Sequence, residues 1–310
     1  MRVSTGEIYT QQVNNIQDEN VRLKKTTSEL SSGLRVEQPA DDPFSARRVL
    51  NYTGLENDLL QYQRNIDWTR SWLVQQEEVL DSSSQVLRDA YQLAIQANTD
   101  SLNQDLRANI APSVVQSKEQ MYALANEKTA SGEYLFAGTN SKRMPFVLSG
   151  NSGDIRASVQ YVGNAQERYV EIGPAREMRM NDAGSDVYRV PGTPLDVFAT
   201  LDQFIIALED PRVSNEQAHQ ILNTVIRDLQ LEMDHISAVQ SDVGARREAL
   251  DQEENFNSRF VLNSQINKSN AQDADIVEVA SRQSQELLAL QAAYKGFARI
   301  QNLSLFDALK

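Results

Sequence analysis

Several residue types that carry protein chemistry are missing or rare in this chain of 310 residues. It contains no cysteine, which excludes disulfide bonds, thiolate nucleophiles and Cys-ligated zinc. Its two histidines, His219 and His235, stand sixteen residues apart on one predicted helix, and at about 24 Å along that helix they cannot share a metal ion. We therefore expect no catalytic residue, no metal site and no cofactor.

Long apolar runs are also missing. No stretch reaches the roughly 18 consecutive apolar residues that a membrane-spanning helix needs. The first residues of the chain lack the apolar core of a secretory signal peptide. The sequence therefore predicts no membrane span, and export, if it occurs, without a cleaved signal peptide.

Positive charge is in short supply, with 30 Lys and Arg against 43 Asp and Glu, a net charge of −13. Nucleic acids and anionic membranes bind basic surfaces, so neither is an expected partner. Residues 1–43 carry five basic and seven acidic groups, and residues 265–310 carry five of each. Both ends are thus nearly neutral, which suits burial among many copies, while the acidic middle suits contact with solvent.

Two long helices with seven-residue apolar repeats are the strongest pattern that the chain does contain. The first begins at Pro43, with Asp42 as its N-cap, and continues to about Asn98. The second begins after Ser214, which forms a capping box with Gln217. Heptad repeats of this length predict helices packed side by side. The repeating residues are Leu59, Ile66, Leu73, Leu80 and Leu87 in the first helix, and Leu222, Leu229, Ile236, Val243 and Leu250 in the second.

The two ends of the chain carry narrower apolar stripes, and the first terminal helix is expected to end at Gly33. These stripes either pack together within one chain or stay loose until neighbouring subunits bury them. We favour the second alternative, because isolated helices with a narrow apolar stripe are marginal in water. The predicted subunit-interface residues are Val13, Ile16, Leu23, Leu30, Ile276, Leu287, Leu290, Tyr294, Phe297, Leu303 and Leu305.

The middle of the chain is richer in glycine and proline. A third, shorter helix is predicted between residues 100 and 131, with Pro112 as a kink or early-turn residue. Residues 158–162 and 168–172 alternate polar and apolar side chains, which predicts a β-hairpin between them. Thr193 is the expected cap of a short helix that ends near Leu208.

These patterns predict a mainly α fold: a long antiparallel helical bundle or coiled-coil rod with a small inserted antiparallel β domain. We expect three domains. Residues 1–43 and 265–310 form a terminal coiled-coil domain, residues 44–143 and 193–264 form the long-helix bundle, and residues 144–192 form the β insertion.

Four stretches carry a resemblance to a known family: LSSGLRV at residues 30–36, PADDP at 39–43, GEYLFAGTN at 132–140 and NLSLFDAL at 302–309. With these stretches the chain resembles the flagellin superfamily, and most closely the hook–filament junction proteins within it. The order of long helices, β insertion and terminal helix agrees with that family along nearly the whole chain.

The resemblance implies a subunit that leaves the cell through the flagellar type III apparatus and polymerises outside it into a tubular helical assembly of many copies. Its implied partners are a hook-side junction protein and flagellin. A cytoplasmic export chaperone is also implied, and it would hold the C-terminal helix at Leu287, Leu290, Tyr294 and Phe297. The implied location is the hook–filament junction of the bacterial flagellum.

Two other functions stay open: a flagellin-type filament subunit and, with less support, a cytoplasmic coiled-coil scaffold. An enzyme is a poor third option, because the apparent motifs have simpler explanations. Asp41 and Asp42 precede Pro43 and are typical of a capping loop rather than a catalytic pair. Trp68 and Trp72 are one helical turn apart and favour helix packing over a binding surface. Residues 150–153 lack the ending of a phosphate loop and indicate a turn.

Overall fold

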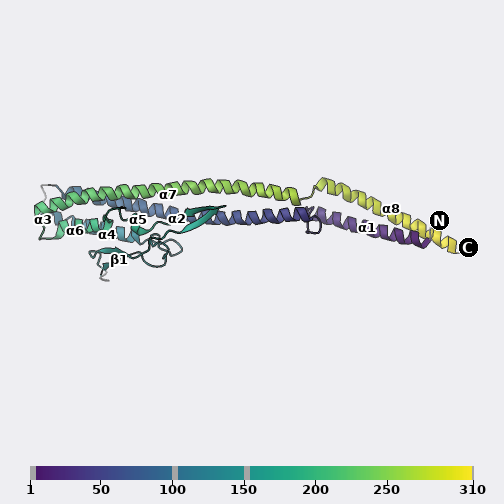
Figure 1. Ribbon diagram of the computed structural model, residues 1–310, viewed down its shortest axis with the longest axis horizontal. Helices are drawn as coiled ribbons and strands as arrows, with labels where there is room; N and C mark the ends of the chain where they lie inside the picture. The colour runs from purple at the N-terminus through teal and green to yellow at the C-terminus, as the bar shows by residue number, and fades with distance from the viewer. Residues whose placement is uncertain (1–4, 100–103, 150–153, 309–310) are drawn as a thin grey trace. The chain divides into compact units, whose positions relative to one another are not determined.

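The structure is a computed structural model that describes residues 5–99, 104–149 and 154–308 (Figure 1). It confirms a mainly helical fold with a small antiparallel β region. The chain divides into two compact units. We call residues 1–59 with 259–310 the terminal unit, and residues 60–258 the central unit. The unit boundaries fall inside the two longest helices.

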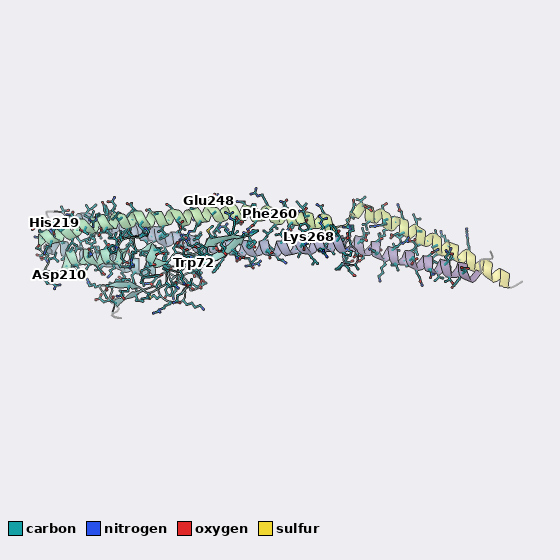
Figure 2. The ribbon with its side chains drawn as sticks, viewed as in Figure 1. Trp72, Asp210, His219, Glu248, Phe260 and Lys268 are labelled. Atoms are coloured by element: carbon teal, nitrogen blue, oxygen red, sulfur yellow. The ribbon has the colours of Figure 1, made fainter. Side chains whose placement is uncertain are left out.

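In the terminal unit, helix α1 (Thr5–Ser32) lies beside helix α8 (Ile276–Ala308) (Figure 1). The beginning of α2 (Pro43–Ala97) and the end of α7 (Asn215–Gln272) complete this unit. Lys268 on α7, labelled in Figure 2, has its Nζ 2.9 Å from Glu56 Oε2 on α2. Ser264 Oγ donates a hydrogen bond of 3.3 Å to the carbonyl of Tyr52.

The loop between α1 and α2 contacts the loop between α7 and α8. Gly33 follows α1 with a φ of 72°, a conformation that favours glycine, and its N–H donates to the carbonyl of Glu29, so the predicted C-terminal signal is confirmed. The N–H of Arg35 donates to the carbonyl of Gln272 at 2.8 Å, and the N–H of Ala274 donates to the carbonyl of Gly33 at 2.9 Å. Backbone hydrogen bonds therefore join the α1–α2 loop to the α7–α8 loop.

Helices α2 and α7 supply the main core of the central unit through the predicted heptad positions. Ile66, Leu73, Leu80 and Leu87 on α2 are fully buried, as are Leu222, Leu229, Ile236, Val243 and Leu250 on α7. The polar column beside the α2 repeat is buried as well. Gln76 donates a hydrogen bond to Asp182, and Ser83 Oγ lies 3.2 Å from the hydroxyl of Tyr188. The polar positions thus contact the segment at residues 180–188.

Shorter helices cover the end of the central unit. The predicted third helix is two elements, α3 (Gln104–Ala108) and α4 (Ala111–Ala125), so it ends six residues earlier than expected. Pro112 lies in the first turn of α4, as predicted. Residues 100–103 are outside the described part of the chain.

Helix α6 (Val197–Glu209) begins later than predicted. Asp196, rather than Thr193, is its N-cap, and its carboxylate accepts hydrogen bonds from the N–H groups of Phe198 and Ala199. Thr193 instead closes a turn, in which its hydroxyl donates to the carbonyl of Val190. The short helix α5 (Gly184–Val187) precedes this turn.

The predicted hairpin between residues 158–162 and 168–172 is wrong. Strand β2 (Val159–Tyr161) pairs with the earlier strand β1 (Phe146–Leu148), and β3 (Tyr169–Gly173) pairs with the later strand β4 (Arg176–Arg179). The two sheets are separate and both antiparallel. Phe146 anchors the first sheet, because its ring packs against Tyr188 and Phe198 at centroid distances of 5.5 and 5.3 Å. Strand β2 thus pairs with the strand before it in the sequence and β3 with the strand after it, rather than with each other.

Candidate assembly surface of the terminal helices

The pairing of α1 with α8 buries part of the predicted interface stripe within one chain. Ile16 and Leu290 are buried, and the rings of Tyr9 and Phe297 have centroids 5.2 Å apart. Arg282 Nη2 donates a hydrogen bond of 2.7 Å to the carboxylate of Glu29. For these side chains the structure follows the alternative in which the two ends pack together.

A second face of α8 is apolar and exposed. Val277 is 81% exposed and Leu288 is 67% exposed. These residues are eleven positions apart, about three turns, and so lie on the same side of the helix. Ile276, Leu287 and Tyr294 lie at the edge of the face that packs on α1 and are about half-exposed, and the hydroxyl of Tyr294 accepts a hydrogen bond of 3.4 Å from Asn20 on α1. We call these five residues the α8 stripe.

The predicted interface residues therefore divide into four groups. Ile16 and Leu290 are buried, and Val13, Leu23, Leu30 and Phe297 are partly buried. Ile276, Leu287 and Tyr294 are exposed on the α8 stripe. Leu303 and Leu305 lie in α8, but their side chains are outside the described part of the chain.

The sequence prediction missed Val277 and Leu288, the two most exposed members of the α8 stripe. A heptad template assigns one apolar face to a helix, whereas α8 has two. The eleven-residue spacing of Val277 and Leu288 is the signal that could have found the second face, since it matches three turns of a straight helix.

The loop before α2 is held by hydrogen bonds to two carboxylates, those of Asp41 and Asp42. Asp42 accepts hydrogen bonds from the N–H groups of Phe44 and Ser45, which confirms it as the N-cap. Hydrogen bonds from Ser45 lower the pKa of Asp42 to about 2, with Arg35 as a further partner. The pKa of Asp41 is also lowered, mainly by a backbone hydrogen bond from Gln38. The carboxylates thus fix the loop, as expected for a capping pair.

The remaining candidate residues are found in structural contacts. His219 Nδ1 lies 2.8 Å from Asn98 Oδ1, and His235 Nε2 lies 2.7 Å from the carbonyl of Asp186. Across the described residues, no group of three His, Asp or Glu side chains could hold a metal ion. The same residues contain no helix long and apolar enough to cross a membrane. Residues 150–153, predicted as a turn, lie outside the described part.

Comparison with known proteins gives a consistent result. The bacterial flagellin N-terminal helical region matches residues 3–141. Flagellar hook-associated protein 3 of Salmonella typhimurium is 27% identical to the chain over 316 residues, with 99% of both proteins covered. The protein of the same name from Escherichia coli is 26% identical over 325 residues, with 100% of both covered.

A solved structure adds the fold. The flagellar junction protein from Legionella pneumophila matches 73% of this chain and 100% of its own length, with a TM-score of 0.60 at 17% identity. Residues 3–141 thus match the N-terminal helical region of bacterial flagellin, and the chain is similar over its full length to flagellar hook-associated protein 3, which confirms the resemblance to the flagellin superfamily.

Proposed function

We propose that the chain is a structural adaptor of the bacterial flagellum, which joins a hook-side junction protein to the flagellin filament. The α8 stripe is the observation that carries this proposal, because it leaves apolar side chains in solvent beside a helix pair that is already formed. Full-length similarity to hook-associated proteins supports the place of assembly. The proposed role is structural and uses no cofactor.

Assembly into a tube of identical subunits would cover the stripe. Complete burial of a large apolar side chain gives about 1.5–3 kcal/mol. The members of the stripe are already partly covered, so each contributes only part of that amount. Their sum must also offset the loss of translational and rotational freedom on association. Contact with one neighbour is thus weak, and several neighbours must contribute together, which makes assembly cooperative.

The same stripe is the proposed contact for an export chaperone before secretion. Leu287 and Tyr294 are exposed on it, whereas Leu290 is buried and Phe297 is partly buried against α1. A chaperone that covers the stripe in the cytoplasm would prevent early assembly. Release of the chaperone at export would then make the stripe available outside the cell, at the hook–filament junction.

Leu288→Asp tests the proposal, because it places a charge on the exposed stripe without opening the α1–α8 contact. We expect the purified variant to keep its helical content, measured by circular dichroism, and to lose sedimentable assemblies. Ile95→Asp is the matched control, since Ile95 is also half-exposed but lies on α2 in the central unit. Normal assembly of Leu288→Asp would contradict the proposal.

A flagellin-type filament subunit is the second candidate, favoured by the match of residues 3–141 to the flagellin N-terminal region. The two functions differ in copy number. Quantitative mass spectrometry of sheared filaments decides between them: a trace component fits the junction role, and the main component fits a filament subunit.

A further inference from the structure

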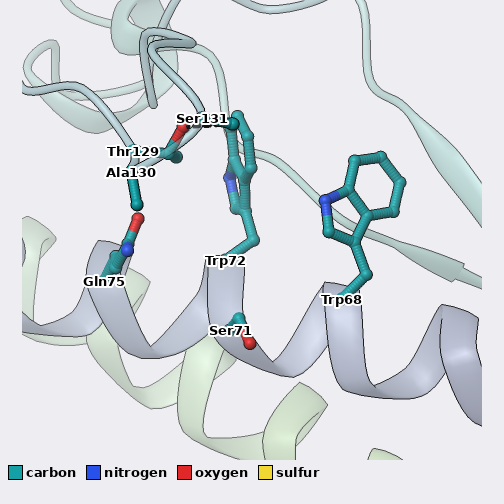
Figure 3. Close-up of a pocket in the computed structure, with 7 residues that line it drawn as sticks. All are labelled: Trp68, Ser71, Trp72, Gln75, Thr129, Ala130 and Ser131. Carbon is teal, nitrogen blue, oxygen red and sulfur yellow. Dashed lines mark hydrogen bonds between the residues drawn. The ribbon is translucent and has the colours of Figure 1, made fainter.

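Contacts within the chain occupy the surroundings of the buried tryptophan of α2. Figure 3 shows Trp68 and Trp72 one turn apart beside a pocket of the central unit. Trp72 is only 3% exposed, and the guanidinium carbon of Arg168 lies 4.6 Å from the centroid of its ring. Arg168 is in turn paired with Glu133 at 3.7 Å. Trp72 is thus packed within the chain, and a more open apolar surface is found in the terminal unit.

A pocket in the terminal unit lies between the α1–α2 loop and the first turns of α2. Its volume is about 160 Å³. Val36 is its most buried member at 4% exposed, whereas Leu50 at its rim is 67% exposed. A cavity of about 150 Å³ holds benzene in another protein, so this pocket is large enough for one branched apolar side chain. Its apolar lining residues are Val36, Pro39, Ala46, Val49 and Leu50.

Exposed apolar and basic side chains lie beside this pocket on α2. Phe44 is 72% exposed, and Arg47 lies three residues from both Phe44 and Leu50, so the three stand on neighbouring turns of one side of the helix. Arg47 and Arg48 are exposed, and neither forms an ion pair with a residue that the structure describes. We call Phe44, Arg47, Arg48 and Leu50, together with the pocket, the α2 patch.

The acids of the preceding loop do not neutralise the α2 patch, because they are already engaged. Lys25 pairs with Asp41 at 3.0 Å, and Arg35 pairs with Asp42 at 3.3 Å. Glu37 accepts a hydrogen bond of 2.8 Å from a serine hydroxyl of α1. The α2 patch thus combines an apolar pocket with two positive charges.

The first turn of α8 has the complementary character. Val277 is the most exposed large apolar side chain that the structure describes, at 81%. The next residue, Glu278, is also exposed and forms no ion pair within the described part of the chain. No Lys or Arg stands between Lys268 and Arg282, and both of these are paired with glutamates. The α8 stripe therefore begins with an apolar side chain beside an unneutralised negative charge.

We propose that the first turn of α8 in one copy docks on the α2 patch of the next copy, with Val277 in the pocket and Glu278 beside Arg47. This inference rests on the proposed function and names the surface that covers the start of the α8 stripe. Two α2 patches would bring arginines together, and two α8 turns would bring glutamates together, so like surfaces repel. The contact is therefore head-to-tail, and it can repeat around a ring or along a helix.

A second copy is the occupant because every chain carries both halves of the contact. Within one chain neither half covers the other, since Val277 and Leu50 stay exposed. Apolar burial provides the attraction, and the charges at the rim select which surfaces meet.

Disulfide cross-linking gives a direct test, because the natural chain has no cysteine. Val277→Cys and Leu50→Cys are made as separate variants, one with a size tag, then mixed, assembled and oxidised. A disulfide requires Cα atoms about 4.4–6.8 Å apart. We expect non-reducing gels to show the mixed dimer far above its statistical share, and no mixed dimer when Ile95→Cys of the central unit replaces Leu50→Cys. Mixed dimers at or below the statistical share, or assemblies without cross-links, would overturn the docking.

Charge reversal tests the same pairing by a second route. Arg47→Glu and Glu278→Arg should each raise the critical concentration for assembly several-fold, because each places like charges together at the contact. The two changes in one chain restore opposite charges and should return the critical concentration toward the parent value. Lys24→Glu is the matched control, since Lys24 is an exposed cation of the terminal unit outside the α2 patch. A combined variant that assembles no better than either single variant would overturn the pairing.

The outcomes separate this docking from the adaptor function. Assemblies that need Leu288 but show neither the mixed cross-link nor the charge rescue would overturn the α2 patch as the partner surface and leave the adaptor function intact. Cross-linking of Leu50→Cys only to cysteine variants of flagellin or of a hook-side protein would overturn a second copy as the occupant. A parent chain that assembles under no condition would overturn both proposals.

Discussion

Glu232 is a buried carboxyl group on α7 and only 1% exposed. Thr200 donates a hydrogen bond of 2.6 Å to its Oε1, whereas Oε2 has no donor among the described residues. Burial raises the pKa of Glu232 to about 8, and the nearby carboxylates of Asp196 and Asp228 act in the same direction. The side chain is therefore mostly protonated at neutral pH.

Glu232→Gln should remove a pH dependence of folding. A raised pKa in the folded state means that stability is complete below the usual glutamate pKa of 4.5 and is lost as pH rises through about 8. We expect the variant to match the parent at pH 5 and to exceed it by about 2–4 kcal/mol in the free energy of unfolding at pH 9.

Urea denaturation at pH 5, 7 and 9 measures this difference. Glu248→Gln is the control, because Glu248 is an exposed carboxylate on the same helix (Figure 2). Parallel pH profiles for the parent and Glu232→Gln would contradict the buried carboxyl as the cause.

The helix caps show how much a local sequence pattern can predict. Asp42 and the Ser214–Gln217 capping box are confirmed, because each is a local pattern followed by one helix. Thr193 and Asp196 are both good caps within four residues. The choice depends on the turn that Thr193 makes with Val190, which a local pattern does not specify.

At the scale of elements, the sequence predicted helices better than sheets. A seven-residue repeat identifies the buried face of α2 from that helix alone. Alternation in β2 and β3 identifies strands but not their partners, and each of them pairs with a strand of three or four residues that the sequence analysis did not predict. Helix α8 shows the limit of periodicity, since one repeat cannot separate a face that packs on α1 from one that faces solvent.

Leu73→Asp should damage the central unit, because Leu73 is fully buried in the α2 repeat. Burial of a charge without a partner is among the most destabilising single changes, and we expect a loss of about 4 kcal/mol or more. Leu60→Asp on the same helix should have a much smaller effect, since Leu60 is half-exposed.

Thermal unfolding followed by circular dichroism measures both variants. An unchanged Tm for Leu73→Asp would show that the buried face of α2 is assigned incorrectly. A comparable loss of Tm in both variants would mean that stability depends on the whole surface of α2 rather than on its buried face.

At the scale of the whole molecule, charge is divided unevenly between the two units. The terminal unit contains 14 acidic and 13 basic residues, whereas the central unit has a net charge of −12. The sequence indicated this division through its near-neutral ends. It could not place the α8 stripe, because the exposure of that stripe depends on which faces of α8 other elements cover.

Assembly should therefore become easier as salt screens the central units. Between 0.01 and 0.15 M salt the Debye length falls from about 30 to about 8 Å. We expect the critical concentration for assembly to fall several-fold over this range, measured by light scattering at constant pH. A critical concentration that rises with salt would mean that attraction between opposite charges, rather than apolar burial, drives association.

The joined loops of the terminal unit have a mechanical consequence. Leu34 and Asp273 form a β-bridge where both chain segments leave their helices, and the side chain of Arg35 also donates to the carbonyl of Ala271 at 2.8 Å. The α1–α2 loop and the α7–α8 loop are thus tied to each other by hydrogen bonds. Any bend at these loops would therefore carry α1 and α8 together rather than one at a time, and the contacts between those two helices would stay closed.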